Sequence, residues 1–163
     1  MTAKHTQSKL VQLGNTNDLT SFELGNSQIS DINPLAVFTK LRMLNLENNQ
    51  ISDITPLASL TNLTYLDLER NRISDIASLA SLTNLTYLDL ERNQISDIKL
   101  LAPLVNLETL YIGKNQVSDV RPLTSLIKLR ALNIANNNIS KEGITWLRGK
   151  LPNCDITARP YIR

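Results

Sequence analysis

The chain has 163 residues, of which 42% are hydrophobic and only 4% aromatic, so its apolar side chains are mainly those of 29 Leu and 15 Ile. A single Cys excludes a disulfide scaffold and a cysteine-built zinc site, and a single His excludes chemistry that needs two imidazoles. The net charge of +2 is too small to favour nucleic acid or a membrane surface as a partner.

The N-terminal segment, residues 1–18, is expected to cap the fold, with a short amphipathic helix from Lys4 to Leu13 over the first coil. It contains no apolar stretch like the core of a signal peptide, and no run in the chain approaches the roughly 20 apolar residues that span a bilayer. We therefore expect a cytoplasmic protein, unless an export signal lies outside these residues.

Residues 19–139 repeat with a period of 22, and five asparagines mark that period most clearly. Each follows a Leu-x-x-aliphatic-x-aliphatic track such as Leu63, Leu66 and Leu68, and each precedes an aliphatic residue by two positions. An aspartate also recurs in phase, from Asp31 to Asp119. The asparagines are Asn49, Asn71, Asn93, Asn115 and Asn137.

Alternating aliphatic residues predict a short strand with one apolar face in every period. Such a strand buries that face only when copies stack in parallel, which joins the leucines into one core. The asparagine amide is expected to satisfy backbone groups inside the turn that follows. In the return segment, Asn33-Pro34 and Thr55-Pro56 predict short helical turns with Asn or Thr as the N-cap.

The last return segment predicts a true α-helix, because Ile144, Leu147 and Leu151 have helical spacing after the N-cap candidate Ser140. Together with a final edge strand ending at Ile156, this makes residues 140–163 a C-terminal cap of the same single domain. Trp146 is expected to shield the end of the core, and Cys154 to replace a core leucine as a buried side chain.

The pattern from Leu41 to Leu60, L-x-x-L-x-L-x-x-N-x-I-S-D-I-x-P-L-x-x-L, resembles the leucine-rich repeat of the 22-residue type. It is similar to the repeats of bacterial internalins and of the leucine-rich regulatory subunit of protein phosphatase 1. The resemblance implies an α/β repeat solenoid: a curved, right-handed coil with a parallel β-sheet on the concave face and short helical turns on the convex face. The family uses this scaffold mainly to bind other proteins, and the fold does not select the partner.

Two of the repeats are almost the same, since Leu57 to Ile76 and Leu79 to Ile98 differ only at Arg72 and Gln94. Near-identity of this kind fits either a recent duplication or a designed consensus, and the diverged outer repeats favour duplication. On the sheet face opposite the leucines, these middle coils combine aromatic, acidic and basic side chains. The predicted partner-binding residues are Tyr65, Asp67, Glu69, Arg70, Tyr87, Asp89, Glu91, Arg92, Tyr111 and Lys114.

These columns have two interpretations. One is a surface charge lattice that was copied with its repeat and has no ligand. The other is a binding patch with tyrosine anchors, whose acidic centre favours a protein or peptide with Lys or Arg at the contact. Identical carboxylates on an open face lack the asymmetry that acid/base catalysis requires, and nothing resembles a calcium loop, so we expect no enzyme, metal or cofactor.

The leading hypothesis is therefore a non-enzymatic protein-interaction module. The alternatives are the repeat region of an internalin-like surface adhesin, and a structural or engineered solenoid without an evolved ligand. The oligomeric state is left open by the sequence.

Overall fold

A computed structural model describes residues 18–158, which form one parallel sheet of seven strands in sequence order. The expected N-terminal helix from Lys4 to Leu13 lies outside the described residues. The first six strands pair with their neighbours at the repeat spacing, so that Leu66 is aligned with Leu88. The strands are β1 (Ser21–Glu23), β2 (Met43–Asn45), β3 (Tyr65–Asp67), β4 (Tyr87–Asp89), β5 (Thr109–Tyr111), β6 (Ala131–Asn133) and β7 (Asp155–Thr157).

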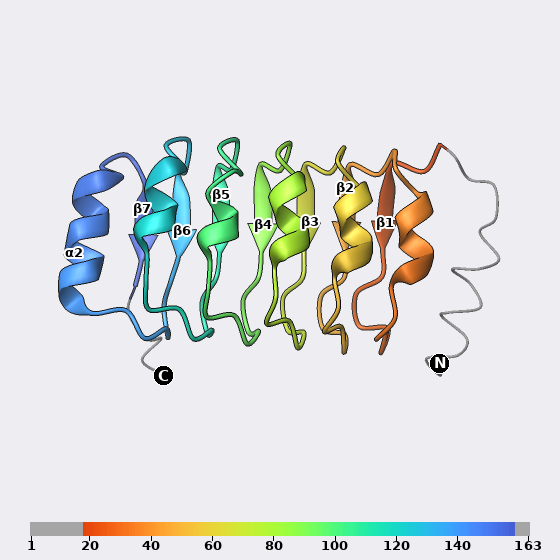
Figure 1. Cartoon of the computed structure of the whole chain (residues 1–163), viewed down its shortest axis with the longest axis horizontal. Coiled ribbons are helices and arrows are strands. Elements are labelled where there is room, and N and C mark those ends of the chain that lie inside the picture. The colour runs from red at the N-terminus through yellow and green to blue at the C-terminus, as the bar shows by residue number, and fades with distance from the viewer. Residues whose placement is uncertain (1–17, 159–163) are drawn as a thin grey trace.

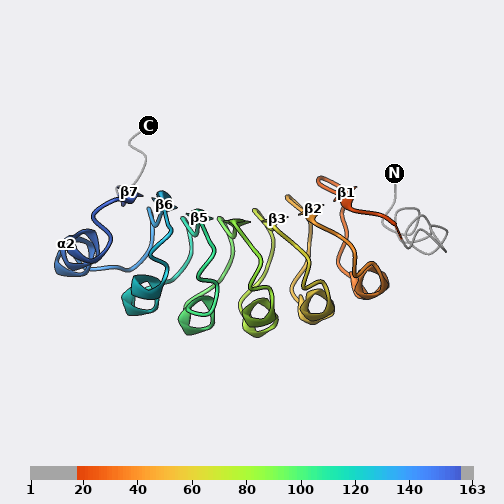
Figure 2. The ribbon, with the colours of Figure 1, turned by 90° about the horizontal axis from the view of Figure 1, so that it is seen from above.

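The coils stand side by side along one axis, each contributing a strand and a short helix (Figure 1). Seen from above, the strands follow the inner edge of a shallow arc and the helices follow the outer edge (Figure 2). This confirms the predicted repeat solenoid with its sheet on the concave face. The outer row is made of 3₁₀-helices: η1 (Asn33–Val37), η2 (Thr55–Ser59), η3 (Ala77–Ser81), η4 (Lys99–Leu101) and η5 (Arg121–Ser125).

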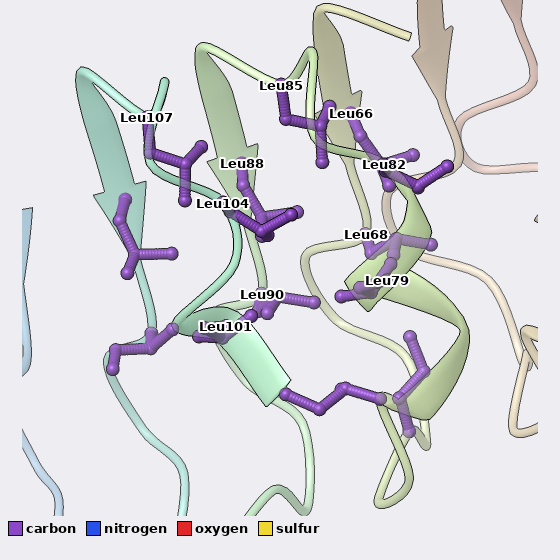
Figure 3. Packing of buried hydrophobic residues seen from close by; sticks show 14 of the residues in the cluster. Leu66, Leu68, Leu79, Leu82, Leu85, Leu88, Leu90, Leu101, Leu104 and Leu107 are labelled. Carbon is purple, nitrogen blue, oxygen red and sulfur yellow. The ribbon is translucent and has the colours of Figure 1, made fainter. Parts of the chain in front are cut away.

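Leucines from both rows meet between the sheet and the helices and form a continuous core (Figure 3). In one coil, Leu66 and Leu68 come from the strand side and Leu79 from η3, and all three are fully buried. Burying a side chain of this size contributes roughly 1.5 to 3 kcal/mol. The interior repeats from coil to coil, so the same aliphatic residue fits the same place each time.

The recurring aspartates begin the outer helices, which corrects the N-cap expected from the sequence. Thr55 and Asn33 are the first residues of their helices, and neither cap position has a side-chain hydrogen bond. Instead, Asp53 Oδ1 accepts a hydrogen bond from the Thr55 backbone N–H at 2.9 Å. An aspartate makes this bond because its short side chain reaches the N–H two residues on. The same bond joins Asp31, Asp75, Asp97 and Asp119 to the residues two positions later.

Ser78 breaks this pattern, because its hydroxyl is buried without a hydrogen-bond partner and η1, η2 and η5 have proline at that position. It borders a polar pocket of about 70 Å³ between two coils. We expect Ser78→Pro to raise the free energy of unfolding by about 1 kcal/mol, because proline restricts the unfolded chain and removes the unsatisfied hydroxyl. Urea denaturation measures the change.

Ala77→Pro is the matched control for this prediction. The Ala77 backbone N–H donates to Asp75 Oδ1 at 2.9 Å, so proline there removes a bond and is expected to destabilise the chain. Equal effects of the two substitutions, or a loss of stability with Ser78→Pro, would contradict the account of Ser78.

The C-terminal helix is confirmed as α2 (Lys141–Lys150), with the Ser140 side chain accepting from the Gly143 N–H. The role assigned to Trp146 is wrong, since 41% of that residue is exposed and the Lys150 ammonium lies 5.8 Å from its ring centroid. Leu147 closes the core instead and is fully buried. The tryptophan is one position away from the face of α2 that meets the core.

The last strand is also shifted from its expected position. Ile156 is aligned with Leu132, so it occupies the place that the sequence pattern gave to Cys154. The ten residues of α2 replace a five-residue 3₁₀-helix, and the longer return segment moves the strand along the chain. Cys154 is left in the turn before β7 and is only half-buried, although burial still raises the pKa of its thiol to about 11.

Candidate functional site

Three tyrosines form a contiguous aromatic cluster on the concave face, which we call the tyrosine patch: Tyr65, Tyr87 and Tyr111. Tyr65 and Tyr87 are aligned across β3 and β4, and their rings stack at 4.3 Å between centroids. Tyr111 meets Tyr87 edge to face at 5.8 Å. Because side chains alternate along a strand, the buried Leu66 and Leu88 place the neighbouring tyrosines on the opposite side of the sheet. All three tyrosines remain partly exposed.

The aspartates of this surface are buried, which corrects the expectation of an open acidic centre. Asp67 and Asp89 are each only 7% exposed. Each accepts a hydrogen bond from the backbone N–H two residues later, at 2.9 and 2.8 Å. Asn45 and Asn133 make the same bond in β2 and β6, so the position has a structural role that either an amide or a carboxylate performs. Their role in binding a partner stays a prediction.

Burial changes the protonation of these acids. Desolvation, followed by the repulsion of neighbouring carboxylates, raises the pKa of Asp89 from 3.8 to about 7, although its hydrogen bond from Glu91 N–H opposes the shift. The pKa of Asp67 is raised by the same causes. The pKa of Tyr87 is also raised, first by burial and then by Asp89, so the hydroxyl stays protonated. At neutral pH, the centre of the patch therefore carries less negative charge than its sequence indicates.

The glutamates are held by different neighbours. Glu69 lies between two guanidinium groups, 3.3 Å from Arg70 Nε and 3.4 Å from Arg92 Nε. Glu91 reaches two coils along the sheet and accepts a hydrogen bond from the Asn133 amide. Gly113 makes this possible, because a Cβ atom there would lie 2.8 Å from Glu91 Oε1.

The basic residues occupy a left-handed backbone position that the sequence pattern did not reveal. Arg70, Arg92 and Lys114 have φ of 54°, 55° and 55°. Asparagine, which tolerates this conformation best after glycine, occupies the same position in the first two coils and in the sixth. The signal was present in the sequence, since Asn26, Asn48 and Asn136 are in phase with the three basic residues.

The asparagine ladder is confirmed as a structural feature of the turn. Asn71 Oδ1 accepts from the Ile51 N–H at 3.0 Å, and its Nδ2 donates to the carbonyl of Leu46 at 3.0 Å and that of Leu68 at 3.1 Å. One amide thus joins two successive coils where the strand ladder has ended. Asn49, Asn93, Asn115 and Asn137 make equivalent bonds.

The described residues hold no group of three or more His, Cys, Asp or Glu side chains placed to bind a metal ion. Between residues 18 and 158, no helix is long and apolar enough to cross a membrane.

Comparison with known proteins places the repeats in a family. The family model described as leucine-rich repeats in two copies matches residues 17–59, 39–81, 61–104 and 105–149. The chain belongs to the leucine-rich repeat family. Its fold and its internalin-like neighbours indicate a protein-interaction module, in a family of non-enzymatic binding proteins. None of the curated proteins compared with the chain is a match.

Several solved structures of leucine-rich repeat proteins are similar. An internalin of Listeria monocytogenes, inlF, is 38% identical with a TM-score of 0.85, over 91% of this chain and 44% of its own. Internalin C2 of the same species is 36% identical with a TM-score of 0.73, over 87% of this chain and 72% of its own. A leucine-rich repeat protein of Leptospira interrogans is 26% identical with a TM-score of 0.83, over 90% of this chain and 38% of its own. The chain thus spans less than half the length of the inlF and Leptospira proteins.

Proposed function

We propose that this leucine-rich repeat chain binds a protein or peptide on its concave face, with the tyrosine patch as the centre of the contact. The observation that carries the proposal is the cluster itself: three of the four tyrosines in the chain lie in contact on one face of three successive coils. Tyrosine is enriched where interfaces concentrate their binding energy, because its ring buries a large area with little loss of conformational freedom.

We further propose that the partner places a basic side chain beside Asp67 and Asp89, which adjoin the tyrosine patch in β3 and β4. Among residues 18–158, the ion pairs of Lys and Arg do not include Asp67 or Asp89, and no basic residue contributes to the raised pKa of either carboxyl. A cation from a partner would favour the ionised form of Asp89, whose pKa is raised to about 7. Affinity for such a partner should therefore increase as the pH rises from 6 to 8.

The test is the double substitution Tyr87→Ala/Tyr111→Ala, in a pull-down followed by titration of the captured partner. We expect affinity to fall by about 100-fold, because truncating an interface anchor costs about 1 to 2 kcal/mol or more for each residue. Trp146→Ala is the control, since this exposed aromatic residue lies on α2 and outside the concave face. Urea denaturation of both variants separates lost contacts from lost stability. Unchanged affinity in the double variant would contradict the proposed site.

A second candidate is the repeat region of an internalin-like surface adhesin, which the 38% identity with the Listeria internalin favours. The two candidates differ in location, because an adhesin is exported and the sequence favoured the cytoplasm. Fractionation of the source cells with an antibody against the chain tests this. Recovery in the cell envelope supports the adhesin, and recovery in the cytoplasm contradicts it. A solenoid without a ligand would capture no partner in the pull-down.

A further inference from the structure

Three basic side chains border the tyrosine patch in a single row, which we call the basic ridge: Arg70, Arg92 and Lys114. Each comes from the residue that ends the concave segment of its coil, and the same position is Asn48 in the coil before the row and Asn136 in the coil after it. The row therefore extends over the three coils that carry the tyrosines and no further.

The backbone of the ridge is a costly place for these residues. A left-handed φ brings the Cβ atom too close to the following carbonyl oxygen, and asparagine tolerates this better than arginine or lysine. The conformation is fixed by the ladder, since the Arg70 N–H donates to the Glu91 carbonyl and the Arg92 N–H to the Gly113 carbonyl. A strained position that keeps a charged side chain, where asparagine would suit the fold, points to a function of the charge.

The two arginines of the ridge stay exposed although they share one carboxylate. The side chains of Arg70 and Arg92 are 52% and 39% exposed, whereas that of Glu69, which both contact, is 23% exposed. Among residues 18–158, the ion pairs of both guanidinium groups are made with Glu69, and the charge of Arg92 also acts on Glu91. Of the other acids nearby, Asp67 and Asp89 are buried, and Glu91 is partly exposed and interacts electrostatically with Lys114 and Arg92.

From this arrangement we infer that the basic ridge binds an acidic protein segment that lies across the strands. The inference rests on the proposed function, because both place binding on the concave face. It assigns the contact to different residues, and the bound segment is acidic where the proposed partner side chain is basic. Cations one coil apart are spaced by the strand separation of about 4.8 Å. Carboxylates three or four residues apart on a helix are spaced by about 4.5 to 6 Å along its axis, so an acidic helix matches the row.

A single-stranded nucleic acid fits this surface less well than an acidic protein segment. Proteins that bind such strands combine a basic groove with aromatic faces on which the bases stack. Here the rings of Tyr65 and Tyr87 stack on each other, and Tyr111 contacts Tyr87. The stacked ring faces are therefore not available to bases.

The experiment uses the full chain and a fluorescein-labelled helical peptide with one row of glutamates at alternating i+3 and i+4 spacing. Its matched control carries lysine in place of each glutamate. Fluorescence anisotropy is measured at low and at physiological salt. We expect the acidic peptide to bind, its affinity to fall at the higher salt, and the lysine peptide to bind at least tenfold more weakly.

The decisive variant is Arg70→Asn/Arg92→Asn/Lys114→Asn, because asparagine is the residue that the chain itself uses at this backbone position. We expect the triple variant to be at least as stable as the parent chain and to bind the acidic peptide about tenfold more weakly. Equal binding by the triple variant, absence of binding at low salt, or tighter binding of an oligothymidylate of the same charge would overturn the inference.

The tyrosine variant separates this inference from the proposed function. Tyr87→Ala/Tyr111→Ala is expected to retain at least half of the affinity for the acidic peptide, because the ridge residues are untouched. Loss of partner capture in the tyrosine variant with peptide binding retained supports both proposals. If the tyrosine variant still captures the partner while the triple variant no longer binds the acidic peptide, the result contradicts the tyrosine patch and supports the ridge.

Discussion

Replacing Asn93 with alanine is expected to lower the free energy of unfolding by about 3 to 5 kcal/mol. Its amide satisfies four buried or half-buried backbone groups. The Oδ1 atom accepts from the Ile73 N–H at 3.0 Å, and Nδ2 donates to carbonyls of Leu68, Leu90 and Glu91 at 3.0 to 3.2 Å. The Ile73 N–H loses its only partner, which costs about 1 to 3 kcal/mol. The three carbonyls keep bonds from Asn71, Asn115 and Arg70, and each bond that they lose costs about 0.5 to 1.5 kcal/mol.

Asn137→Ala is the matched control, because the same amide stands in the last turn of the ladder and is only partly buried. Water can reach the backbone groups that lose the Asn137 side chain, so we expect the free energy of unfolding to fall by about 1 to 2 kcal/mol. Urea denaturation of both variants, monitored by circular dichroism, gives the two values. If Asn93→Ala lost no more stability than Asn137→Ala, burial of the backbone groups would not determine how much each asparagine of the ladder stabilises the chain.

The sequence predicts the fold well because its period is fixed by physical needs that recur in every coil. Leu66 and Leu88 fill the same interior, and Asn71 and Asn93 bridge the same turn, so one coil explains the next. The prediction is wrong where the period changes. At the C-terminus, α2 lengthens the return segment and Ile156 takes the core position that counting gave to Cys154.

The candidate site is less predictable than the fold. Alternation along the strand places Asp89 on the concave face correctly, yet it does not show that a short side chain there bonds to its own backbone and is covered. Glutamate one column away is long enough to reach other coils, as Glu91 does. Which charges face a partner therefore depends on side-chain length and backbone φ, and neither follows from the hydrophobic period.

This difference changes the electrostatic character of the surface. Counted from the sequence, acids dominate the centre of the middle coils. In the structure, Asp67 and Asp89 are covered and Glu69 is shared by two arginines, while the guanidinium groups of Arg70 and Arg92 stay exposed. The concave surface thus combines partly exposed tyrosine rings, buried aspartates and a row of basic side chains.

Asp89→Asn is expected to stabilise the chain above pH 7 and to leave its stability nearly unchanged at pH 4. The pKa of Asp89 is about 7 in the folded chain, above its ordinary value of 3.8, so the native state holds the proton more tightly than the unfolded state does. The contribution of the Asp89 proton to the free energy of unfolding is fully present below pH 4. It is lost as the pH rises from 4 to 7, and the free energy changes no further with this group above pH 7. An uncharged amide avoids the loss.

We expect Asp89→Asn to add about 2 kcal/mol at pH 8. One unit of pKa corresponds to 1.36 kcal/mol, and the partial access of solvent reduces the full effect of the shift. The substitution preserves the local structure, because Asn133 accepts the equivalent backbone hydrogen bond in β6. Urea denaturation of the parent chain and the variant at pH 4, 6 and 8 measures the difference.

Asp119→Asn is the control of opposite sign for this pH series. Hydrogen bonds from the Arg121 side chain and backbone N–H lower the pKa of Asp119 to about 2, so its ionised form stabilises the folded chain. Its contribution is present above pH 4 and is lost only as the pH falls toward 2, so the amide should cost stability at pH 6 and 8 alike. If Asp89→Asn showed the same sign as Asp119→Asn at pH 8, burial would not be what governs the Asp89 carboxyl.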